Sequence, residues 1–372
     1  MARKFAREEI MPAAAALDAS GEYPWELIRK AHALGLMNTH IGEAYGGMGL
    51  GALSSTFITE ELAYACTGVN TAIEANSLAA APVIIAGNEE QKATFLGRLT
   101  AEPCVASYCV TEPGAGSDVA ALRTTAVRHG ADGRWRINGS KMWITNAGHA
   151  SWFFVLARTA DADASTGEAF TAFLVDGATR GVSVGRKEAN MGQRASDTRG
   201  VTFDDVVVDD ACRLGAEGGG FAIAMRAFDL TRPMIGSSSV GLARRAFEEL
   251  YRYAHERRTF GKPLFAHQSV AFELADMYAT LAAAQGMVRQ AAWEVDQGRS
   301  NTLNASVAKL IASEHANRCA QRAVQLAGGV GFNTEYVFEK LQRDAAILSI
   351  YEGASNIQRL IISRLLKSAI TE

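Results

Sequence analysis

The sequence has few cysteines and no recognisable metal-binding motif. Its five cysteines form no CxxC pair and are odd in number, which favours reduced thiols in a cytosolic or matrix-like compartment. Its seven histidines form no HExxH and no ExxH, so neither a zinc-protease site nor a di-iron helical bundle is indicated. We therefore expect no metal site.

Other signatures are also missing. The chain has no GxxxxGK[ST] and no GxGxxG, which argues against a P-loop and a nicotinamide-binding Rossmann unit. A net charge of -3 gives no strong electrostatic case for binding nucleic acid. No apolar run reaches the roughly 18 residues of a membrane span, so we expect none. Residues 1–18 lack the apolar core of a signal peptide and suggest an amphipathic helix of the mature protein.

The hydrophobic pattern changes twice and predicts an α+β protein of three domains. Residues 1–103 indicate an N-terminal all-α domain. Residues 104–215 contain short runs rich in Val, Phe, Thr and Trp, which are typical of a middle β-barrel or β-sandwich domain. Residues 216–372 return to the helical period and predict a C-terminal four-helix bundle. A first helix carries Leu242, Phe247, Leu250, Tyr251 and Ala254 on one apolar face, and helices continue over 267–297, 301–327, 335–345 and 355–368.

The middle domain shows regularly spaced strand and turn signals. The expected strands cover 104–111, 122–128, 134–138, 152–158, 170–175, 182–186 and 200–208. The expected turns are Asp132-Gly133, Asn138-Gly139, Asp176-Gly177 and Asp204-Asp205. Residues 141–146 also read as a strand. The pattern contains no alternation of strands and helices, so a parallel sheet with crossover helices is not indicated.

A carboxylate near the C-terminus is the leading candidate for chemistry. Glu352 follows Tyr351 and precedes a predicted helix, with Ser355 as its N-cap and Gln358 at the capping-box position. The helix dipole favours the charged carboxylate, whereas burial in an apolar pocket raises its pKa. That balance suits a general base. From these residues alone, a glutamate that only complements the dipole is the commoner alternative.

Two segments of the β domain have the side chains to bind a flat, polar cofactor. Residues 108–118 read as a strand entering a glycine-rich turn, where the hydroxyls of Thr111 and Ser117 are available. Trp143 and Thr145 are two residues apart on one strand, so they share a face and can stack on and hydrogen-bond to a ring. An ordinary rim turn and ordinary packing are the alternatives.

Three helical segments carry unusual residues, each with a structural alternative. Residues 228–233 place Asp229 and Arg232 in an apolar helix, where a buried arginine needs a partner. Residues 256–263 end a helix with basic side chains. These side chains suit anion binding, but they equally suit the negative end of the helix dipole. Residues 325–331 end a helix in glycines, as left-handed capping does.

Taken together, the order and spacing of these segments resemble the acyl-CoA dehydrogenase family, and its medium-chain members in particular. The resemblance covers about residues 2–367 and includes 191–194 and 291–296. It implies the family's three-domain fold. It also implies an FAD-dependent enzyme of fatty acid β-oxidation, which removes two hydrogens from an acyl-CoA thioester and leaves a trans-2-enoyl-CoA.

The resemblance implies that Glu352 is the base that removes the α-proton while a hydride passes to flavin N5. The backbone N–H of Glu352 and a ribityl hydroxyl of FAD would bind the thioester oxygen. Some relatives carry the base on the helix that matches residues 228–233. Here Glu352 is present, and that helix offers Asp229, Thr231 and Arg232, so the common arrangement is expected.

The same resemblance implies a set of FAD-binding residues. Thr145 would bond near N5, Ser117 would lie by the pyrophosphate, and residues after 256 would reach the adenosine-diphosphate part across a subunit interface. The set is Tyr108, Val110, Thr111, Gly116, Ser117, Trp143, Ile144, Thr145, Arg257, Thr259, Phe260, His267, Gln268, Gln325, Gly328, Gly329, Ser355 and Asn356. Such sharing implies an obligate homotetramer, a dimer of dimers.

The implied substrate-binding residues are Ser117, Asp229, Arg232, Glu74, Tyr351, Glu352 and Gly353. Asp229 and Arg232 match positions at the CoA end, where Arg232 can equally be structural. Glu74 matches the residue that closes the acyl cavity in medium-chain members.

Three positions depart from the family pattern. Ala354 stands in place of a threonine, and Asn356 in place of a glutamine, so we expect FAD to bind with fewer contacts. Asn70 replaces a glutamine in the acyl pocket, which predicts a slightly longer or wetter tunnel.

The implied electron acceptor is electron-transfer flavoprotein, because oxidase relatives are usually much longer than this chain. An acyl-CoA oxidase, or a short- or branched-chain dehydrogenase, is the alternative within the fold. A non-dehydrogenating, nucleic-acid-binding relative is a less favoured alternative, because such a protein is expected to carry an added basic domain. We expect a cytoplasmic location for a bacterial protein and the mitochondrial matrix for a processed eukaryotic one.

Overall fold

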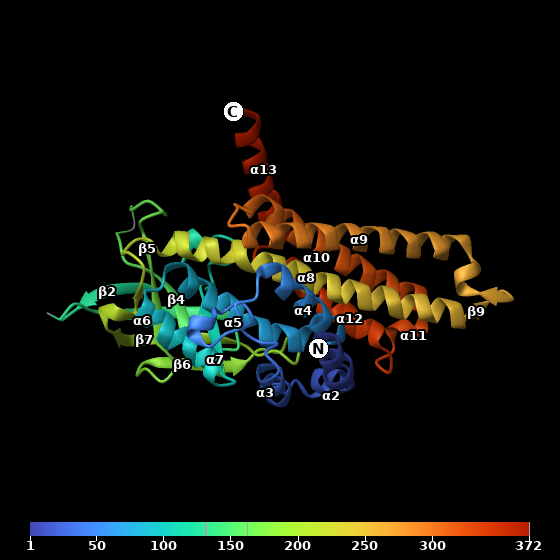
Figure 1. Ribbon diagram of the computed structural model, residues 1–372, viewed down its shortest axis with the longest axis horizontal. Helices are drawn as coiled ribbons and strands as arrows, with labels where there is room; N and C mark the ends of the chain where they lie inside the picture. Colours follow the sequence, from blue (N-terminus) through green and yellow to red (C-terminus); the bar gives the residue numbers. More distant parts are fainter. Residues whose placement is uncertain (131, 162, 372) are drawn as a thin grey trace.

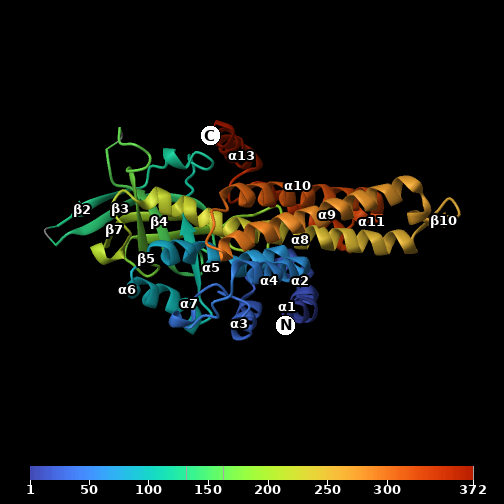
Figure 2. The same cartoon turned by 45° about the horizontal axis from the view of Figure 1, so that its top comes forward.

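The structure is a computed structural model that describes residues 1–130, 132–161 and 163–371. Figure 1 shows an elongated molecule with the β-sheet at one end and long helices running to the other. Helices of the N-terminal part lie along one side of both, as the turned view in Figure 2 also shows. The predicted α, β, α order is therefore confirmed.

The N-terminal part is helical, because its apolar residues recur at helical spacing and bury one face. Its α-helices are α1 (Ala2–Phe5), α2 (Met11–Ser20), α3 (Trp25–Ala33), α4 (Ala52–Ala65), α5 (Thr67–Ala86), α6 (Glu89–Gln91) and α7 (Gly97–Ala101). Helix α5 packs against β1 and against the first long helix of the C-terminal part. It thus joins all three parts of the molecule.

Helix α5 also corrects one expectation. By length and composition alone it could cross a membrane, although no such run was expected. However, 61% of its apolar window is buried inside the protein. A core helix meets the same criteria as a membrane span, so this feature is weak support for one.

The middle part is an eight-stranded sheet in the order β6-β7-β3-β2-β4-β5-β8, with β1 paired in parallel to β4. Its strands are β1 (Val105–Cys109), β2 (Thr125–His129), β3 (Arg134–Thr145), β4 (Ala150–Arg158), β5 (Phe170–Asp176), β6 (Val182–Lys187), β7 (Thr198–Val208) and β8 (Arg213–Leu214). The strands β4 and β5 are almost entirely buried, because helices cover one face and the curled sheet covers the other.

Two of the predicted turns are wrong. Asn138-Gly139 lies inside β3 and Asp204-Asp205 inside β7, where the register of the two strands shifts. The Asn138 amide donates to Oδ1 of Asp205 over 3.0 Å, and the Asp205 N–H donates to Oδ1 of Asn138 over 2.8 Å. These hydrogen bonds pair backbone and side-chain groups at the irregularity, so the turn-forming residues build a bulge within a continuous strand pair.

The C-terminal part is built on three long helices, α8 (Gly220–Glu256), α9 (Gln268–Asp296) and α10 (Thr302–Ala327). Alanines line their contacts, which lets the backbones approach closely. The short strands β9 (Arg258–Thr259) and β10 (Lys262–Pro263) join α8 to α9, and the remaining helices are α11 (Gly329–Phe332), α12 (Val337–Ala345) and α13 (Ser355–Thr371). Helix α12 packs against α10 and α8, whereas α13 projects from the bundle (Figure 1).

Candidate active site

The turn that carries Glu352 lies between α12 and α13. Glu352 and Gly353 both have positive φ angles, 50° and 95°, so two consecutive residues adopt a left-handed conformation. This conformation is unfavourable for a glutamate and marks a turn that the surroundings hold in place. A side chain at Gly353 would also approach Gln358 Nε2 within 2.5 Å, so glycine is required here.

Two side chains hold this turn by its carbonyl oxygens. Nζ of Lys309, from α10, donates to the Gly353 carbonyl over 2.8 Å. Nε2 of Gln358 donates to the same oxygen over 2.8 Å and to the Glu352 carbonyl over 3.2 Å. The predicted capping box is therefore wrong: Ser355 is the first residue of α13, and Gln358 reaches back to the carbonyls of the turn.

The electrostatic surroundings of Glu352 match those of a general base. Burial raises the pKa of its carboxyl group to about 7, because the charged form loses hydration. The Thr231 hydroxyl, 2.8 Å from Oε2, opposes this rise, as do the positive charges of Arg232 and Lys309. A carboxylate with a pKa near the working pH can both accept and release a proton.

Asp229 and Arg232 form a buried ion pair on α8 beside this carboxylate. Nη1 of Arg232 lies 3.0 Å from Oδ1 of Asp229, and only 5% of Arg232 is exposed. Thr302 donates to Oδ2 of Asp229 over 2.8 Å, and Asn301 donates to the Asp229 carbonyl over 2.7 Å. Asp229 is thus the partner that a buried arginine needs, which favours the alternative that Arg232 has a structural role.

A second carboxyl group faces the same region from α5. Burial raises the pKa of Glu74 to about 7, and the charge of Glu352 contributes to that rise. Thr59 donates to Oε2 of Glu74 over 3.3 Å. The charge of Glu352, on the turn before α13, therefore disfavours ionisation of Glu74 on α5.

The β domain contributes Tyr108 to this site. Its ring stacks on Phe154 of the neighbouring strand at 4.7 Å, and its hydroxyl donates to the Ala224 carbonyl of α8 over 3.2 Å. Burial, and after it the charge of Glu352, raises the pKa of the Tyr108 hydroxyl well above its usual value. Strand β1 is thus placed directly beside the predicted base.

Strand β3 presents Trp143 in an exposed position next to β1. Trp143 has a φ angle of 64° at a register shift of β3, and 56% of it is exposed. The N–H of Met142 donates to the Thr111 carbonyl over 2.9 Å, and Ser107 donates to the Thr145 carbonyl over 2.6 Å. These bonds bring the predicted flavin-binding segments of β1 and β3 together.

Val110 and Ile144, two of the predicted FAD residues, have buried side chains. They are 3% and 2% exposed and belong to the cores on either side of the sheet. Their main-chain groups are the parts that a cofactor could reach. Strand alternation explains the burial of Ile144, because residues next to an outward-facing position point inward.

A buried ion pair that the sequence did not reveal anchors the turn after β1. Lys141 is fully buried, and its Nζ donates to Glu112 Oε1 and to the carbonyls of Val110 and Leu156 over 2.8–3.1 Å. Glu112 also accepts bonds from the residues around Thr124. The pair holds the segment that leads to Gly116 and Ser117, both of which are exposed. A lysine directly before the apolar strand residues Met142, Trp143 and Ile144 is the local sign of it.

The other predicted FAD residues lie far from Glu352 in this chain. Arg257, Thr259, Phe260, His267, Gln268, Gln325, Gly328 and Gly329 surround the end of the helices opposite the β domain (Figure 1). His267 Nε2 lies 3.0 Å from the Thr259 hydroxyl, and Phe260 is 97% exposed. The chain gathers these residues at one place, but it does not bring them to the β face.

The residues near Glu352 and the β face fit the predicted FAD. A side-chain carbon added at Gly116 would meet no described atom within 4 Å, so a ligand can approach the main chain closely there. Oγ of Ser355 is buried and has no hydrogen-bond partner among the residues that the structure describes. Asn356 next to it is exposed. Within the same described ranges, no group of three or more His, Cys, Asp or Glu side chains could hold a metal ion.

Comparison with protein families and with curated proteins gives consistent matches. The N-terminal, middle and C-terminal domains of acyl-CoA dehydrogenase match residues 1–103, 107–206 and 218–367. The chain is 51% identical to a probable medium-chain specific acyl-CoA dehydrogenase 2, mitochondrial, of Caenorhabditis briggsae, covering 100% of this chain and 90% of that protein. It is 40% identical to cyclohexane-1-carbonyl-CoA dehydrogenase of Geobacter metallireducens, covering 99% and 96%.

Solved structures agree with these matches. Butyryl-CoA dehydrogenase of Megasphaera elsdenii has a TM-score of 0.95 at 36% identity, covering 98% of this chain and 96% of that one. A chain from the work on the electron transferring flavoprotein of Acidaminococcus fermentans has a TM-score of 0.95 at 34% identity, with the same coverage. PigA with FAD and proline has a TM-score of 0.93 at 29% identity, covering 98% and 95%.

Proposed function

The chain belongs to the acyl-CoA dehydrogenase family, and from this premise we propose that it converts medium-chain acyl-CoA thioesters to trans-2-enoyl-CoA with Glu352 as the base. FAD is the cofactor. One observation carries the assignment of the base: burial raises the pKa of the Glu352 carboxyl group to about 7, while the Thr231 hydroxyl and the charges of Arg232 and Lys309 favour its ionised form. The 51% identical relative, which is named for medium-chain substrates, supports the substrate class.

Glu352 would take the proton from the α-carbon of the bound thioester. The C–H bond breaks, the proton joins a carboxylate oxygen, and the electron pair moves toward the thioester carbonyl. The backbone N–H of Glu352 lies on the same turn and would donate to that carbonyl oxygen. A fixed donor aimed at developing negative charge lowers the barrier most strongly where water is excluded.

Thr231 can serve both protonation states of the base. Its hydroxyl lies 2.8 Å from Glu352 Oε2 and 3.1 Å from the Ala227 carbonyl, and it has one hydrogen to donate. It would donate to the charged carboxylate before the reaction. Once the carboxyl group holds the substrate proton, Thr231 would donate to Ala227 and accept from Glu352.

The β face would hold the flavin ring of FAD. Trp143 would stack beside the ring, and Thr145, Thr111 and Tyr108 would bind its polar edge, while Ser117 and Gly116 would lie by the phosphates. When bound, FAD supplies the acceptor for the hydrogen that leaves the β-carbon as hydride. The exposed Trp143 and the buried, unpartnered Ser355 hydroxyl support this placement.

The acyl chain would extend toward Glu74 on α5. The side-chain amide nitrogen of Asn70 donates to the Ser238 hydroxyl over 3.3 Å. The side-chain oxygen Oδ1 of Asn70 has no partner among the described residues. A buried amide oxygen of this kind favours a bound water, in keeping with a wetter tunnel. Asp229 and Arg232 would lie on the CoA side and stabilise the site through their ion pair.

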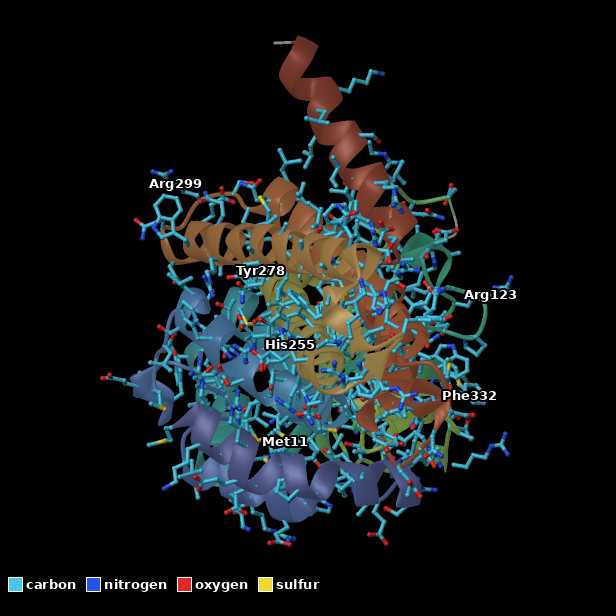
Figure 3. The ribbon with its side chains drawn as sticks, turned by 90° about the vertical axis from the view of Figure 1, so that its right-hand side faces the viewer. Met11, Arg123, His255, Tyr278, Arg299 and Phe332 are labelled. Carbon is cyan, nitrogen blue, oxygen red and sulfur yellow. The ribbon has the colours of Figure 1, made fainter. Side chains whose placement is uncertain are left out.

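Self-association would complete the FAD site. The remaining FAD residues lie at the far end of the helices, where Phe260 and Phe332 are 97% and 83% exposed. Figure 3 shows Phe332 at the outer edge of this end. A groove of about 380 Å³ lined by Phe247, Tyr251 and His255 lies on α8 there, away from Glu352. Exposed aromatic side chains of this size favour a protein interface, and we propose a homotetramer built as a dimer of dimers.

We further propose that electron-transfer flavoprotein accepts the electrons, which the similarity to the Acidaminococcus fermentans chain supports. We propose that the location follows the source: the mitochondrial matrix for a processed eukaryotic protein and the cytoplasm for a bacterial one. The Caenorhabditis relative, which is named as mitochondrial, supports the first case.

A visible spectrum under nitrogen, recorded before and after adding octanoyl-CoA, tests the proposal. We expect a flavin spectrum that bleaches. Butyryl-, isovaleryl-, palmitoyl- and cyclohexane-1-carbonyl-CoA form the comparison series. Stronger bleaching by one of these than by octanoyl-CoA would assign the protein to that substrate class. Rapid reoxidation by air would indicate an oxidase. A bound flavin that no acyl-CoA bleaches would refute the proposed reaction.

A further inference from the structure

We propose that Lys309 is a positioning residue for the base: its ammonium group fixes the turn that carries Glu352, and its positive charge keeps the carboxylate ready to accept a proton. This proposal rests on the proposed function, in which Glu352 removes the substrate α-proton. Lys309 lies on α10, 43 positions before Glu352 (352 − 309), in a helix whose buried side consists mainly of alanines.

The geometry provides the first argument. Lys309 is fully buried, and its Nζ lies 2.8 Å from the Gly353 carbonyl oxygen, which it shares with Gln358 Nε2. That carbonyl belongs to the second of the two left-handed residues of the turn. A strained backbone persists only where the surroundings hold it, and these two donors do so from two different helices.

The charge provides the second argument. A buried ammonium group is costly unless an anion compensates it, and Lys309 hydrogen-bonds to only one partner among the residues that the structure describes. Glu352 is the acidic group that most favours the charged form of Lys309. Burial lowers the pKa of Lys309 to about 8, so the residue remains largely protonated at neutral pH.

Other charged and titratable groups face the same site and also affect the protonation of Glu352 and Lys309. Arg232 on α8 also favours the Glu352 carboxylate, and it opposes the charge of Lys309. Glu74 on α5 and Tyr108 on β1 interact with Glu352. Glu314 on α10 acts weakly on Lys309 and is itself paired with Arg359. Lys309 is thus one of two cations whose removal should raise the proton affinity of the base.

The test compares Lys309→Gln, Lys309→Met, Lys309→Arg and Gln358→Met in the FAD-loaded enzyme. Glutamine keeps a donor for Gly353 but removes the charge, whereas Gln358→Met removes a neutral donor from the same oxygen. Two readouts are used: the pH dependence of kcat/KM, and an infrared difference titration that follows the protonated Glu352 carboxyl group, assigned with Glu352→Gln.

Lys309→Gln should move the acid limb and the infrared midpoint upward by about one pH unit. Lys309→Met should show the same shift with a lower kcat, while Lys309→Arg should titrate close to the wild type. Gln358→Met should lower kcat without moving the midpoint. Superimposed curves for Lys309→Gln and the wild type, or an equal shift in Gln358→Met, would overturn the proposal.

Two neutral variants are used because one of them can fail to fold. If Lys309→Met does not fold, Lys309→Gln still tests the effect of removing the charge. The readouts also separate this proposal from the proposed reaction. A wild type that is inactive with every acyl-CoA refutes the reaction, yet the infrared midpoint still reports whether Lys309 controls the protonation of Glu352.

Discussion

The hydroxyl of Thr231 lies 2.8 Å from Oε2 of Glu352 and 3.1 Å from the carbonyl oxygen of Ala227. A hydroxyl has one hydrogen, so it cannot donate to both oxygens at once. The carboxylate form of Glu352 takes that hydrogen, and the protonated form leaves it to Ala227. The contact therefore has a satisfied arrangement in each protonation state, as the proposed role of Glu352 as the base requires.

Replacing the hydroxyl tests this relationship. Thr231→Val removes a bond to the charged carboxylate, so the pKa of Glu352 should rise and the acid limb of kcat/KM should move upward by about one pH unit. Activity should be reduced below pH 7 and should recover at higher pH. Ser239→Ala is the matched control, because Ser239 also lies on α8 and donates only to Ile235 within the helix. Equal shifts in both variants would indicate general repacking.

Removing the base itself should abolish turnover. Glu352→Gln keeps the size of the side chain and an oxygen that can accept from Thr231, so folding, flavin colour and assembly should persist. The loss of the proton acceptor should lower kcat by about 10³-fold. Steady-state rates, flavin absorbance and light scattering check these three outcomes. A near-normal rate would place the base on another residue.

Glu74 should lower stability at alkaline pH. Burial raises its pKa to about 7 in the folded protein, from a usual value of 4.5. The unfolded chain therefore loses this proton first, and the associated stability falls as the pH rises from 4.5 through 7. Above pH 7 the folded protein holds an unfavourable buried charge.

Glu74→Gln should accordingly raise the melting temperature at pH 8 by about 5 °C, and the gain should shrink as the pH falls toward 5. Thermal unfolding of both proteins across this range checks the prediction. A gain that is constant with pH would mean that the charge of Glu74 is not its cause.

Lys141→Met should destabilise the β domain and release FAD. The variant leaves Glu112 as an uncompensated buried charge, which costs about 3–5 kcal/mol. The turn that leads to Gly116 and Ser117 would also lose its anchor, so flavin content should fall. The double variant Lys141→Met/Glu112→Leu should recover much of the stability, because it removes both charges.

Lys30→Met is the control for the loss of a lysine ion pair. Lys30 pairs with Glu9 and Glu26 at the surface, where such pairs contribute about 0–1 kcal/mol. Urea unfolding and the absorbance ratio of flavin to protein measure both effects. Equal losses in Lys30→Met and Lys141→Met would show that burial does not decide the outcome.

Local patterns in the sequence predicted the fold, and the resemblance to the family selected Glu352 as the predicted base. Period-3.6 and period-2 hydrophobicity depends on near neighbours, so it placed the helices and strands in the right order. The short-range signals failed where a distant partner intervened. Asn138 and Asp205 satisfy each other across two strands and turn a predicted loop into a bulge. Gln358 bonds the turn before it and does not complete a capping box.

Residue types at fixed spacing along the chain are enough to predict the family, the α, β, α order and a glutamate before the last helix. Only the tertiary structure placed Thr231 and Lys309 beside that glutamate and paired Lys141 with Glu112. Contacts between residues far apart in the chain arise from how helices and strands pack. Burial at those contacts then decides charge and pKa, which no local spacing records.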